Sequence, residues 1–306
     1  MAVRVGVIGV GYLGRHHARI YSELEDAELV AVVDIEKEKA DTYAEKYRCQ
    51  SCTDYRDILH KVEALSIVTP TTSHFNIALD CLKAGKDILI EKPITVNITE
   101  ADELIKSSEV TGRIVQVGHL ERYNSAVLAA SGMIRQPMFI ESERLSPFLG
   151  RGIDVDVTLD LMIHDIDIIL SLVSSPIREM RAVGAKVLTD KIDVAKAWLE
   201  FDNGCMALAT VSRLSPEKQR KLKVFQQDAY ICIDYQTAEV KRHFRTEEGG
   251  ISSEIRKPEN MEPLKEELKD FLRCVRERKK PTVSAKEGRE ALKVVLEISA
   301  IINNGK

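Results

Sequence analysis

Residues Val3–Gly14 read VRVGVIGVGYLG. The first half of this stretch, Val3–Ile8, is apolar and rich in β-branched residues, which is typical of a buried parallel strand. The second half, Gly9–Gly14, has the spacing G-x-G-x-x-G and leads into a helical pattern. We therefore predict a strand, a tight turn and a helix in direct succession, which is the opening unit of a doubly wound α/β domain.

The same alternation of strands and helices continues to about residue 120. Further buried strands are predicted at Leu29–Val33, Ala64–Val68, Ile88–Ile90 and Ile114–Val117. The helices between the strands are predicted at Leu13–Leu24, Glu36–Tyr47, His74–Lys83 and Glu100–Val110, the last with Thr99 as its N-cap. Residues 1–120 are thus expected to form a Rossmann domain with a parallel sheet.

A second, α+β domain is predicted over residues 121–283, where one helix at Leu159–Leu172 precedes a run of hairpins. Asn203-Gly204 is a strong signal for a tight hairpin turn. The strands of an open, mainly antiparallel sheet are predicted at Val194–Phe201, Met206–Val211, Lys221–Phe225, Tyr230–Asp234 and Glu239–Phe244. We expect the helix to cover one face of this sheet and another subunit the other, giving a homo-oligomer, either a dimer or a tetramer.

The carboxyl-terminal part of the sequence predicts a surface loop followed by two helices. Residues 245–262 are rich in glycine and charge, which indicates the loop. An apolar stripe over 264–275 predicts the first helix, and another over 291–302 the second, which a capping box at Ser284–Glu287 would start. We expect the helix 284–303 to pack back on the first domain.

Composition limits the class of protein. The chain has 306 residues, a length that fits two domains. Its formal net charge of -4 gives no overall positive potential of the kind that binds nucleic acid or a membrane surface. No apolar run of about 18 residues and no signal peptide occur, so we expect a cytoplasmic protein. Its six cysteines are scattered. Cys49 and Cys52 lack a second ligand pair, so we expect reduced thiols and no metal site.

The glycine turn and a following acid predict a dinucleotide site. Gly9 permits the turn, Gly11 admits the pyrophosphate, and Gly14 allows the helix to pack against the strand. Asp34 ends the second strand, where a carboxylate binds a ribose 2′-hydroxyl and repels a 2′-phosphate. We therefore predict NAD rather than NADP, with Tyr12 and Leu13 of the same turn also contacting it. The alternative is a glycine turn that binds nothing.

A lysine and a histidine are the candidates for chemistry. Lys92, within Glu91-Lys92-Pro93, follows the fourth strand at the sheet edge where ligands bind, and the X-Pro bond permits a cis form. Asp160, His164 and Asp167 have the spacing of one helical face. A carboxylate beside an imidazole makes it a better proton acceptor. The alternatives are a surface lysine and a solvated polar helix face.

Four motifs together resemble the glucose-fructose oxidoreductase, inositol dehydrogenase and MocA family over nearly the whole chain. They are Gly9-x-Gly11-x-x-Gly14-x-x-His17, Thr69-Pro70-x-x-x-His74, Glu91-Lys92-Pro93 and Asp160-x-x-x-His164. The resemblance implies that Lys92 contacts nicotinamide and substrate, that His164 accepts a proton and that Asp160 supports it. It also implies that Thr69, Thr71, His74 and Glu91 line the cofactor site, although many members have asparagine where this chain has Thr71.

A narrower resemblance is to the sugar-nucleotide branch of that family, which includes UDP-N-acetylglucosamine 3-dehydrogenases. It rests on Gly118–Asn124 and on the stretch from Arg144 to Asp156. It implies oxidation of a secondary sugar hydroxyl, with substrate bound by Arg122, Tyr123, Asn124, Arg151, Asp160 and His164. Arginines suit a diphosphate, but Arg122, Arg144 and Arg151 could instead pair with Glu121, Glu141 or Glu143. An inositol or free-sugar dehydrogenase and a non-catalytic NAD-binding regulator remain the alternative functions.

Overall fold

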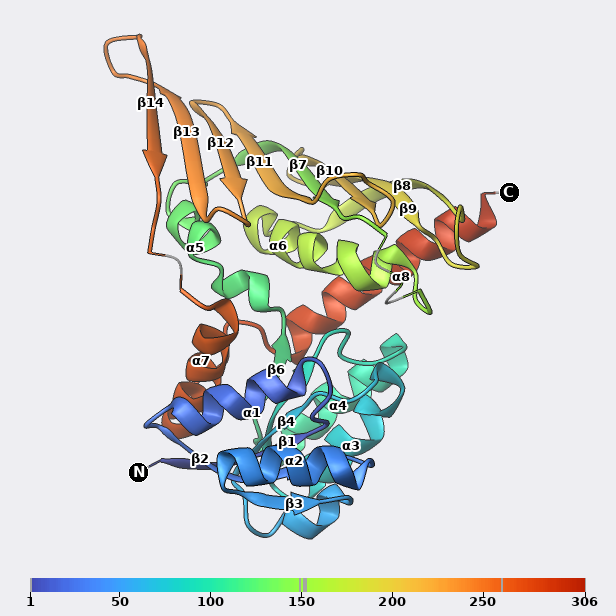
Figure 1. Ribbon diagram of the computed structural model, residues 1–306. Coiled ribbons are helices and arrows are strands. Elements are labelled where there is room, and N and C mark those ends of the chain that lie inside the picture. Colours follow the sequence, from blue (N-terminus) through green and yellow to red (C-terminus); the bar gives the residue numbers. More distant parts are fainter. Residues whose placement is uncertain (1, 149, 151–152, 260, 306) are drawn as a thin grey trace. The chain divides into compact units, whose positions relative to one another are not determined.

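The computed structural model describes residues 2–148, 150, 153–259 and 261–305. The chain divides into two compact units (Figure 1). Unit 1 comprises Met1–Leu120 and Glu262–Arg289, and unit 2 comprises Glu121–Met261 and Glu290–Lys306.

Unit 1 contains a six-stranded parallel sheet in the order β3-β2-β1-β4-β5-β6. Its strands are β1 (Val3–Ile8), β2 (Ala27–Val33), β3 (Gln50–Cys52), β4 (Ala64–Ile67), β5 (Asp87–Glu91) and β6 (Val115–Gly118). This order is that of the Rossmann fold, so the predicted fold class is confirmed. The sequence did not predict β3, which is too short to show a periodic pattern.

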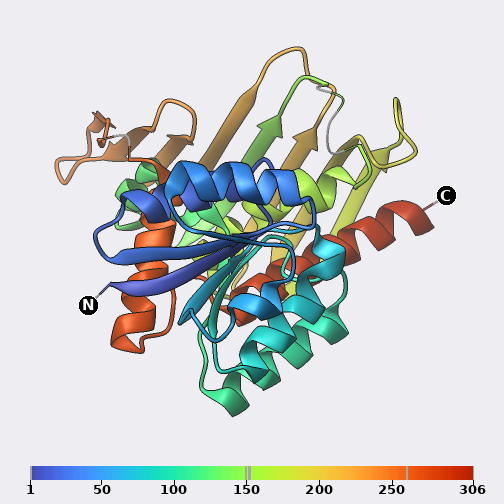
Figure 2. The same ribbon diagram turned by 60° about the horizontal axis from the view of Figure 1, so that its bottom comes forward.

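Helices cover both faces of this sheet, with α1 and α2 on one face and α3 and α4 on the other (Figure 2). They are α1 (Gly14–Glu23), α2 (Lys37–Tyr47), α3 (Thr71–Lys83) and α4 (Ile98–Thr111), and η1 (Tyr55–Ile58) is a short 3₁₀ helix. The predicted cap of α4 is wrong. Asn97 is the N-cap, because its side chain accepts a 2.9 Å hydrogen bond from the Glu100 amide, and Thr99 lies inside the helix.

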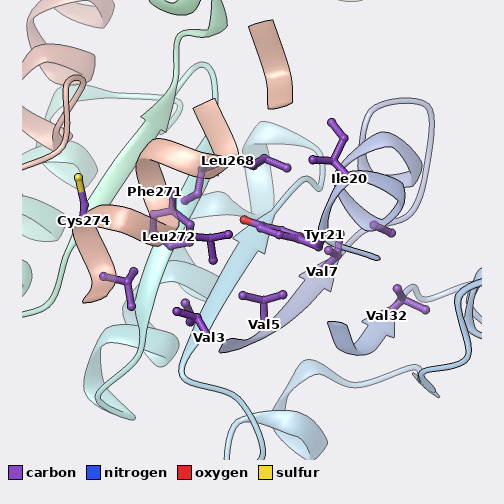
Figure 3. Close-up of a cluster of buried hydrophobic side chains, with 14 of the residues drawn as sticks. Val3, Val5, Val7, Ile20, Tyr21, Val32, Leu268, Phe271, Leu272 and Cys274 are labelled. Atoms are coloured by element: carbon purple, nitrogen blue, oxygen red, sulfur yellow. The ribbon is translucent and has the colours of Figure 1, made fainter. Parts of the chain in front are cut away.

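The helix α7 (Pro263–Glu277) belongs to unit 1, although the sequence placed it in the second domain. Leu268, Phe271 and Leu272 of α7 are fully buried in the same core cluster as Val5 and Tyr21 (Figure 3). An apolar stripe shows that a helix has a buried face but does not identify the sheet that buries it.

Unit 2 contains an eight-stranded sheet in the order β14-β13-β12-β11-β7-β10-β9-β8. Its strands are β7 (Pro137–Leu145), β8 (Ile177–Ala185), β9 (Val194–Phe201), β10 (Met206–Ser212), β11 (Gln219–Gln226), β12 (Ala229–Asp234), β13 (Glu239–Arg245) and β14 (Ile251–Arg256). All neighbouring pairs are antiparallel except β7 and β10. The mainly antiparallel sheet is therefore confirmed, whereas β14 lies where a surface loop was predicted.

Unit 2 also contains the short helix α5 (Ser125–Ser131), the π-helical turn η3 (Thr158–Met162) and the helix α6 (Ile163–Val173). The short 3₁₀ helix η2 (Leu120–Tyr123) has its first residue in unit 1 and its other residues in unit 2. The last helix, α8 (Ala285–Asn304), starts in unit 1 and continues into unit 2 from Glu290. In unit 2, Ser299 of α8 shares a 2.6 Å hydrogen bond with Thr158. Most of α8 therefore belongs to unit 2, which differs from the predicted packing on the first domain.

Candidate functional site

The glycine turn after β1 is held in a form that only glycine fits. Gly9 has a φ angle of +86°, and a Cβ on Gly9 would lie 2.5 Å from the Val68 carbonyl oxygen. A Cβ on Gly14 would lie 1.8 Å from the Gly9 carbonyl oxygen, so α1 starts in close contact with the turn. Both glycines therefore have the structural roles that the sequence predicted.

The surroundings of this turn fit the pyrophosphate and ribose of a dinucleotide. A Cβ on Gly11 would meet no atom of the described residues within 4 Å, so the turn is open to a ligand there. No described side chain caps the start of α1, whose first turn also lacks acidic residues. Free amide groups at a helix start attract phosphate. Asp34 accepts 3.0 Å hydrogen bonds from the amides of Val10 and Glu36, which holds its carboxylate beside the turn.

His74 has a supporting position that the sequence did not predict. Its ring is 1% exposed, with Nε2 lying 2.9 Å from the Thr69 carbonyl oxygen and Nδ1 2.9 Å from the Pro93 carbonyl oxygen. Burial lowers the pKa of His74, although both carbonyl groups favour its protonated form. His74 thus connects the loop after β4 with the loop after β5. Thr69 and Thr71 are half-buried on the first of these loops, at the start of α3.

Glu91 and His17 form a buried pair behind Lys92. The Nε2 of His17 lies 3.2 Å from Glu91 Oε1, and Glu91 Oε2 accepts a 3.2 Å hydrogen bond from the Lys92 amide. Burial opposes the charge of Glu91, but the hydrogen bond and charge of His17, together with the charge and amide of Lys92, outweigh it and lower the pKa of the carboxyl. A Cβ on Gly118 would come within 3.0 Å of this carboxylate. Glu91 therefore positions the backbone of half-buried Lys92, and the Lys92-Pro93 bond is cis.

In unit 2, Asp160 and His164 lie where the helix geometry changes. Asp160 belongs to the π-helical turn η3, and His164 is the second residue of α6. Both side chains are half-buried, whereas Met162 and Ile163 between them are fully buried. Single π-helical turns occur often at functional sites. The sequence predicted a regular helix over this segment, because a pattern of side chains does not reveal a locally wider turn.

Arg144 is the centre of a buried ion cluster and not an open phosphate site. Its guanidinium donates to both oxygens of Asp165, at 2.9 and 3.0 Å, and to Glu121 at 2.8 Å. Burial opposes the charge of Arg144, but Asp165 and Glu121 outweigh it and raise the pKa of Arg144. The Tyr235 ring lies 5.4 Å from the same guanidinium. Of the two roles considered for Arg144, the structure supports the paired one.

Arg122 holds the next acid along α6. Its Nε and Nη2 donate to the two carboxylate oxygens of Asp167, at 2.6 and 3.0 Å. Asp167 is 2% exposed, and its carboxylate binds Arg122, a partner that the helix spacing did not predict. Asn124 caps α5 by accepting from the Ala126 amide, and Tyr123 is buried. The substrate roles of these residues stay predictions, and Arg151 lies outside the described residues.

The described residues contain no group of three or more His, Cys, Asp and Glu side chains placed to hold a metal ion. All six cysteines are free, and burial raises the pKa of Cys49 to about 11. No described helix combines the length and apolarity needed to cross a membrane.

Comparison with known proteins identifies the family of the chain. Residues 3–119 match an oxidoreductase family with an NAD-binding Rossmann fold, and residues 126–232 match the GFO/IDH/MocA carboxyl-terminal domain. The UDP-N-acetylglucosamine 3-dehydrogenase of Acidithiobacillus ferrooxidans is 36% identical over 98% of this chain and 97% of its own. A myo-inositol 2-dehydrogenase of Thermotoga maritima is 25% identical over 95% of this chain and 93% of its own.

The solved structures agree with this result. A structure of the Acidithiobacillus ferrooxidans enzyme has a TM-score of 0.94 to this chain at 34% identity, and covers 99% of this chain and 98% of its own. These matches extend through both units. The chain is a member of the GFO/IDH/MocA family of NAD-binding oxidoreductases.

Proposed function

We propose that this protein oxidises a secondary hydroxyl of a sugar nucleotide, namely the 3-hydroxyl of UDP-N-acetylglucosamine, to a ketone for amino-sugar synthesis of the lipid A type. The observation that carries the proposal is the 36% identity, over 98% of the chain, to an enzyme of that name. The relative named as a myo-inositol 2-dehydrogenase is less similar, at 25% identity over 95% of this chain. An inositol or free sugar is therefore the second candidate substrate.

In the proposed reaction, His164, Asp160 and Lys92 each have a separate role. Bound NAD supplies the acceptor for the hydride that leaves the carbinol carbon. His164 takes the hydroxyl proton, and Asp160 keeps the imidazole oriented for that transfer. Lys92 stabilises the negative charge that develops on the oxygen, and the buried Glu91–His17 pair fixes the backbone from which Lys92 extends.

The substrate is tested by following NAD reduction with UDP-N-acetylglucosamine, other sugar nucleotides, inositols and free sugars. An aminotransferase that consumes the keto product keeps the equilibrium from hiding turnover. We expect activity with UDP-N-acetylglucosamine. Activity with free polyols alone would overturn the sugar-nucleotide assignment, and binding of NAD without turnover of any compound would favour a regulator.

The catalytic roles predict the effect of two alanine variants. Lys92→Ala and His164→Ala should each lower kcat by about 10²- to 10³-fold, because removing one group that stabilises a transition state has this cost. NAD affinity should change little. Lys83→Ala and His60→Ala replace exposed residues of the same types and serve as matched controls. Near-normal turnover in either test variant would remove that residue from the mechanism.

Two further points concern the oligomeric state and the cellular location of the protein. We propose a homo-oligomer formed through the open face of the unit 2 sheet, where a row of aromatic rings lies. A cytoplasmic location stays a prediction from the sequence.

A further inference from the structure

Unit 1 has a pocket of about 400 Å³ outside the predicted cofactor site. It is lined by the end of α4, by the segment Gly112–Val115 that enters β6, and by the connection from α7 to α8. The pocket therefore lies at the amino end of β6. The glycine turn follows the carboxyl end of β1, and all strands of this sheet are parallel. The pocket and the turn therefore lie at opposite ends of the strands.

The lining of the pocket is strongly cationic in a chain whose net charge is -4. Five cationic residues and one carboxylate line it: Arg113, Arg278, Lys279, Lys280, Lys286 and Glu109. Charges of one sign gathered in a concave surface raise the local concentration of the opposite ion. The lining also includes Ser284 and Ala285, where α8 begins, and a helix start adds partial positive charge.

Each lysine of the pocket is paired with a carboxylate, and Lys280 lies 2.7 Å from the less exposed Glu287. Lys286 lies 2.8 Å from Glu109, and Lys279 lies 2.7 Å from Glu277. The side chains of these two lysines are 63% and 69% exposed. Exposed ion pairs contribute little to stability, so a doubly charged anion competes with Glu109 and Glu277 at little cost.

The side chains of the two arginines of the lining differ in their bonding. Arg278 donates to Asp87 at 2.6 Å and to the Gly112 carbonyl at 2.7 Å, which fixes its guanidinium against the sheet. The Nε of Arg113 is buried, and no residue that the structure describes accepts a hydrogen bond from it. A buried donor without an acceptor is costly, and an anion would supply the acceptor.

Most of the remaining lining is apolar and includes Ile105, Ile114 and Pro281, with Ser108 as a polar member. A pocket of this volume is within the range of small-molecule sites, and an apolar wall beside fixed cations suits a ligand with both an anionic and a flat, weakly polar part. Inorganic phosphate would use the cations and leave the apolar wall without a contact.

We propose that this pocket binds an organic phosphate that carries at least two negative charges, such as a nucleoside diphosphate. The phosphates lie against Arg113, Lys279 and Lys286, and the organic body lies against Ile105, Ile114 and Pro281. The site is separate from the dinucleotide site, so both ligands bind to one chain at once.

The test is isothermal titration of the full chain with ADP, inorganic pyrophosphate and adenosine at low ionic strength and saturating NAD. Saturating NAD occupies the dinucleotide site, which would otherwise bind ADP. We expect one ADP per chain, weaker binding of pyrophosphate, no binding of adenosine, and loss of ADP affinity as salt rises. ADP that binds no more tightly than pyrophosphate would overturn the role of the apolar wall.

A matched pair of double variants locates the binding. Lys279→Gln/Lys286→Gln should weaken ADP at least tenfold, whereas Lys83→Gln/Lys106→Gln removes the same charge from exposed positions of unit 1 outside the pocket and should not. Equal affinity in the two variants, or no ADP binding to the unmodified chain, would overturn the proposal. The comparison holds whether or not the chain oxidises a sugar nucleotide, because it measures binding and not turnover.

Discussion

Glu91 and Asp34 are both acids at the carboxyl ends of strands, yet their surroundings give them different roles. Glu91 is 5% exposed, and its oxygens face His17 and the Lys92 amide. Asp34 is half-buried and accepts from the amides of Val10 and Glu36. A buried carboxylate with two protein partners positions its neighbours, whereas a carboxylate near the surface keeps lone pairs for a ligand. We therefore propose Asp34 as the acid that selects between NAD and NADP.

This role predicts the effect of Asp34→Asn on cofactor choice. The amide keeps one acceptor for the Val10 amide but removes the charge that favours a ribose 2′-hydroxyl and repels a 2′-phosphate. The ratio of NADP affinity to NAD affinity should rise about tenfold or more, because hydrogen bonds to charged groups contribute about 1.5–3 kcal/mol. Fluorescence titration with both nucleotides measures the ratio. Glu38→Gln, an exposed change of the same kind in α2, should leave it unchanged, and an unchanged ratio in Asp34→Asn would refute the role.

The partners of single residues were the least predictable part of the site. Gly9, Gly14 and Asp34 could be placed from sequence because their roles depend on neighbours within one strand-turn-helix unit. Arg122 and Arg144 could not, since their partners Asp167 and Asp165 come from a distant segment and are brought close only by the fold. The motif that contains His17 was recognised, but its pairing with Glu91 joins residues 74 positions apart.

At the scale of elements, five strands of the unit 2 sheet were predicted from the sequence, whereas β7, β8 and β14 were not. The hairpin of β9 and β10 was found from apolar alternation and Asn203-Gly204, and its turn has Gly204 at a φ angle of +84°. β14 was missed because it is an edge strand, with Ile251 86% exposed and no buried face to impose alternation. Similarly, β8 is mostly exposed along its length, so no period-2 pattern marks it.

The loop from β8 to β9 depends on one buried acid, Asp193. Its Oδ2 accepts from the amides of Val187, Leu188 and Thr189, at 2.8, 2.7 and 3.0 Å. Burial opposes the charge of Asp193, but the hydrogen bonds from Val187 and Thr189 lower its pKa to about 2. Because the pKa is lower in the folded chain than in the unfolded chain, this stabilisation is complete above about pH 4 and is lost as the pH falls towards 2.

Asp193→Asn should therefore destabilise the protein in a pH-dependent way. At pH 7 the free energy of unfolding should fall by about 2 kcal/mol, because several hydrogen bonds to a charged group are weakened. At pH 3 the difference between the variant and the unmodified protein should be smaller, because the native carboxylate has then lost part of its advantage. Urea unfolding at both values measures this. The exposed Asp190→Asn is the control, and a difference independent of pH would contradict the role of the charge.

At the scale of the whole molecule, the open face of the unit 2 sheet has a row of aromatic rings. Ring centroids lie 5.8 Å apart for Phe139 and Trp198, 5.7 Å for Phe139 and Phe225, and 4.9 Å for Phe225 and Tyr230. The row therefore runs from β9, over β10, to β7, β11 and β12. The alternate residues of these strands, such as Ile140 and Val224, are fully buried on the face that α5 and α6 cover (Figure 1). The aromatic face is thus the one left for another chain.

The chemistry of this face favours a second copy of the same chain. Beside the aromatic row, Lys223 lies 3.3 Å from both Glu141 and Glu143. A surface that has both signs of charge around an apolar centre can pair with itself about a two-fold axis. The unmodified protein should therefore be a dimer, or a tetramer built from such dimers, in size-exclusion chromatography with light scattering.

One substitution on this face should abolish the assembly. Phe225→Glu puts a charge in the middle of the aromatic row, where two copies would bury it without a partner, and the burial of an unpaired charge is strongly unfavourable. The variant should elute as a folded monomer. Val110→Glu adds the same charge at a position of α4 that is 79% exposed and should leave the assembly intact. A monomeric unmodified protein at micromolar concentration, or an oligomeric Phe225→Glu variant, would show that the sheet face is not the interface.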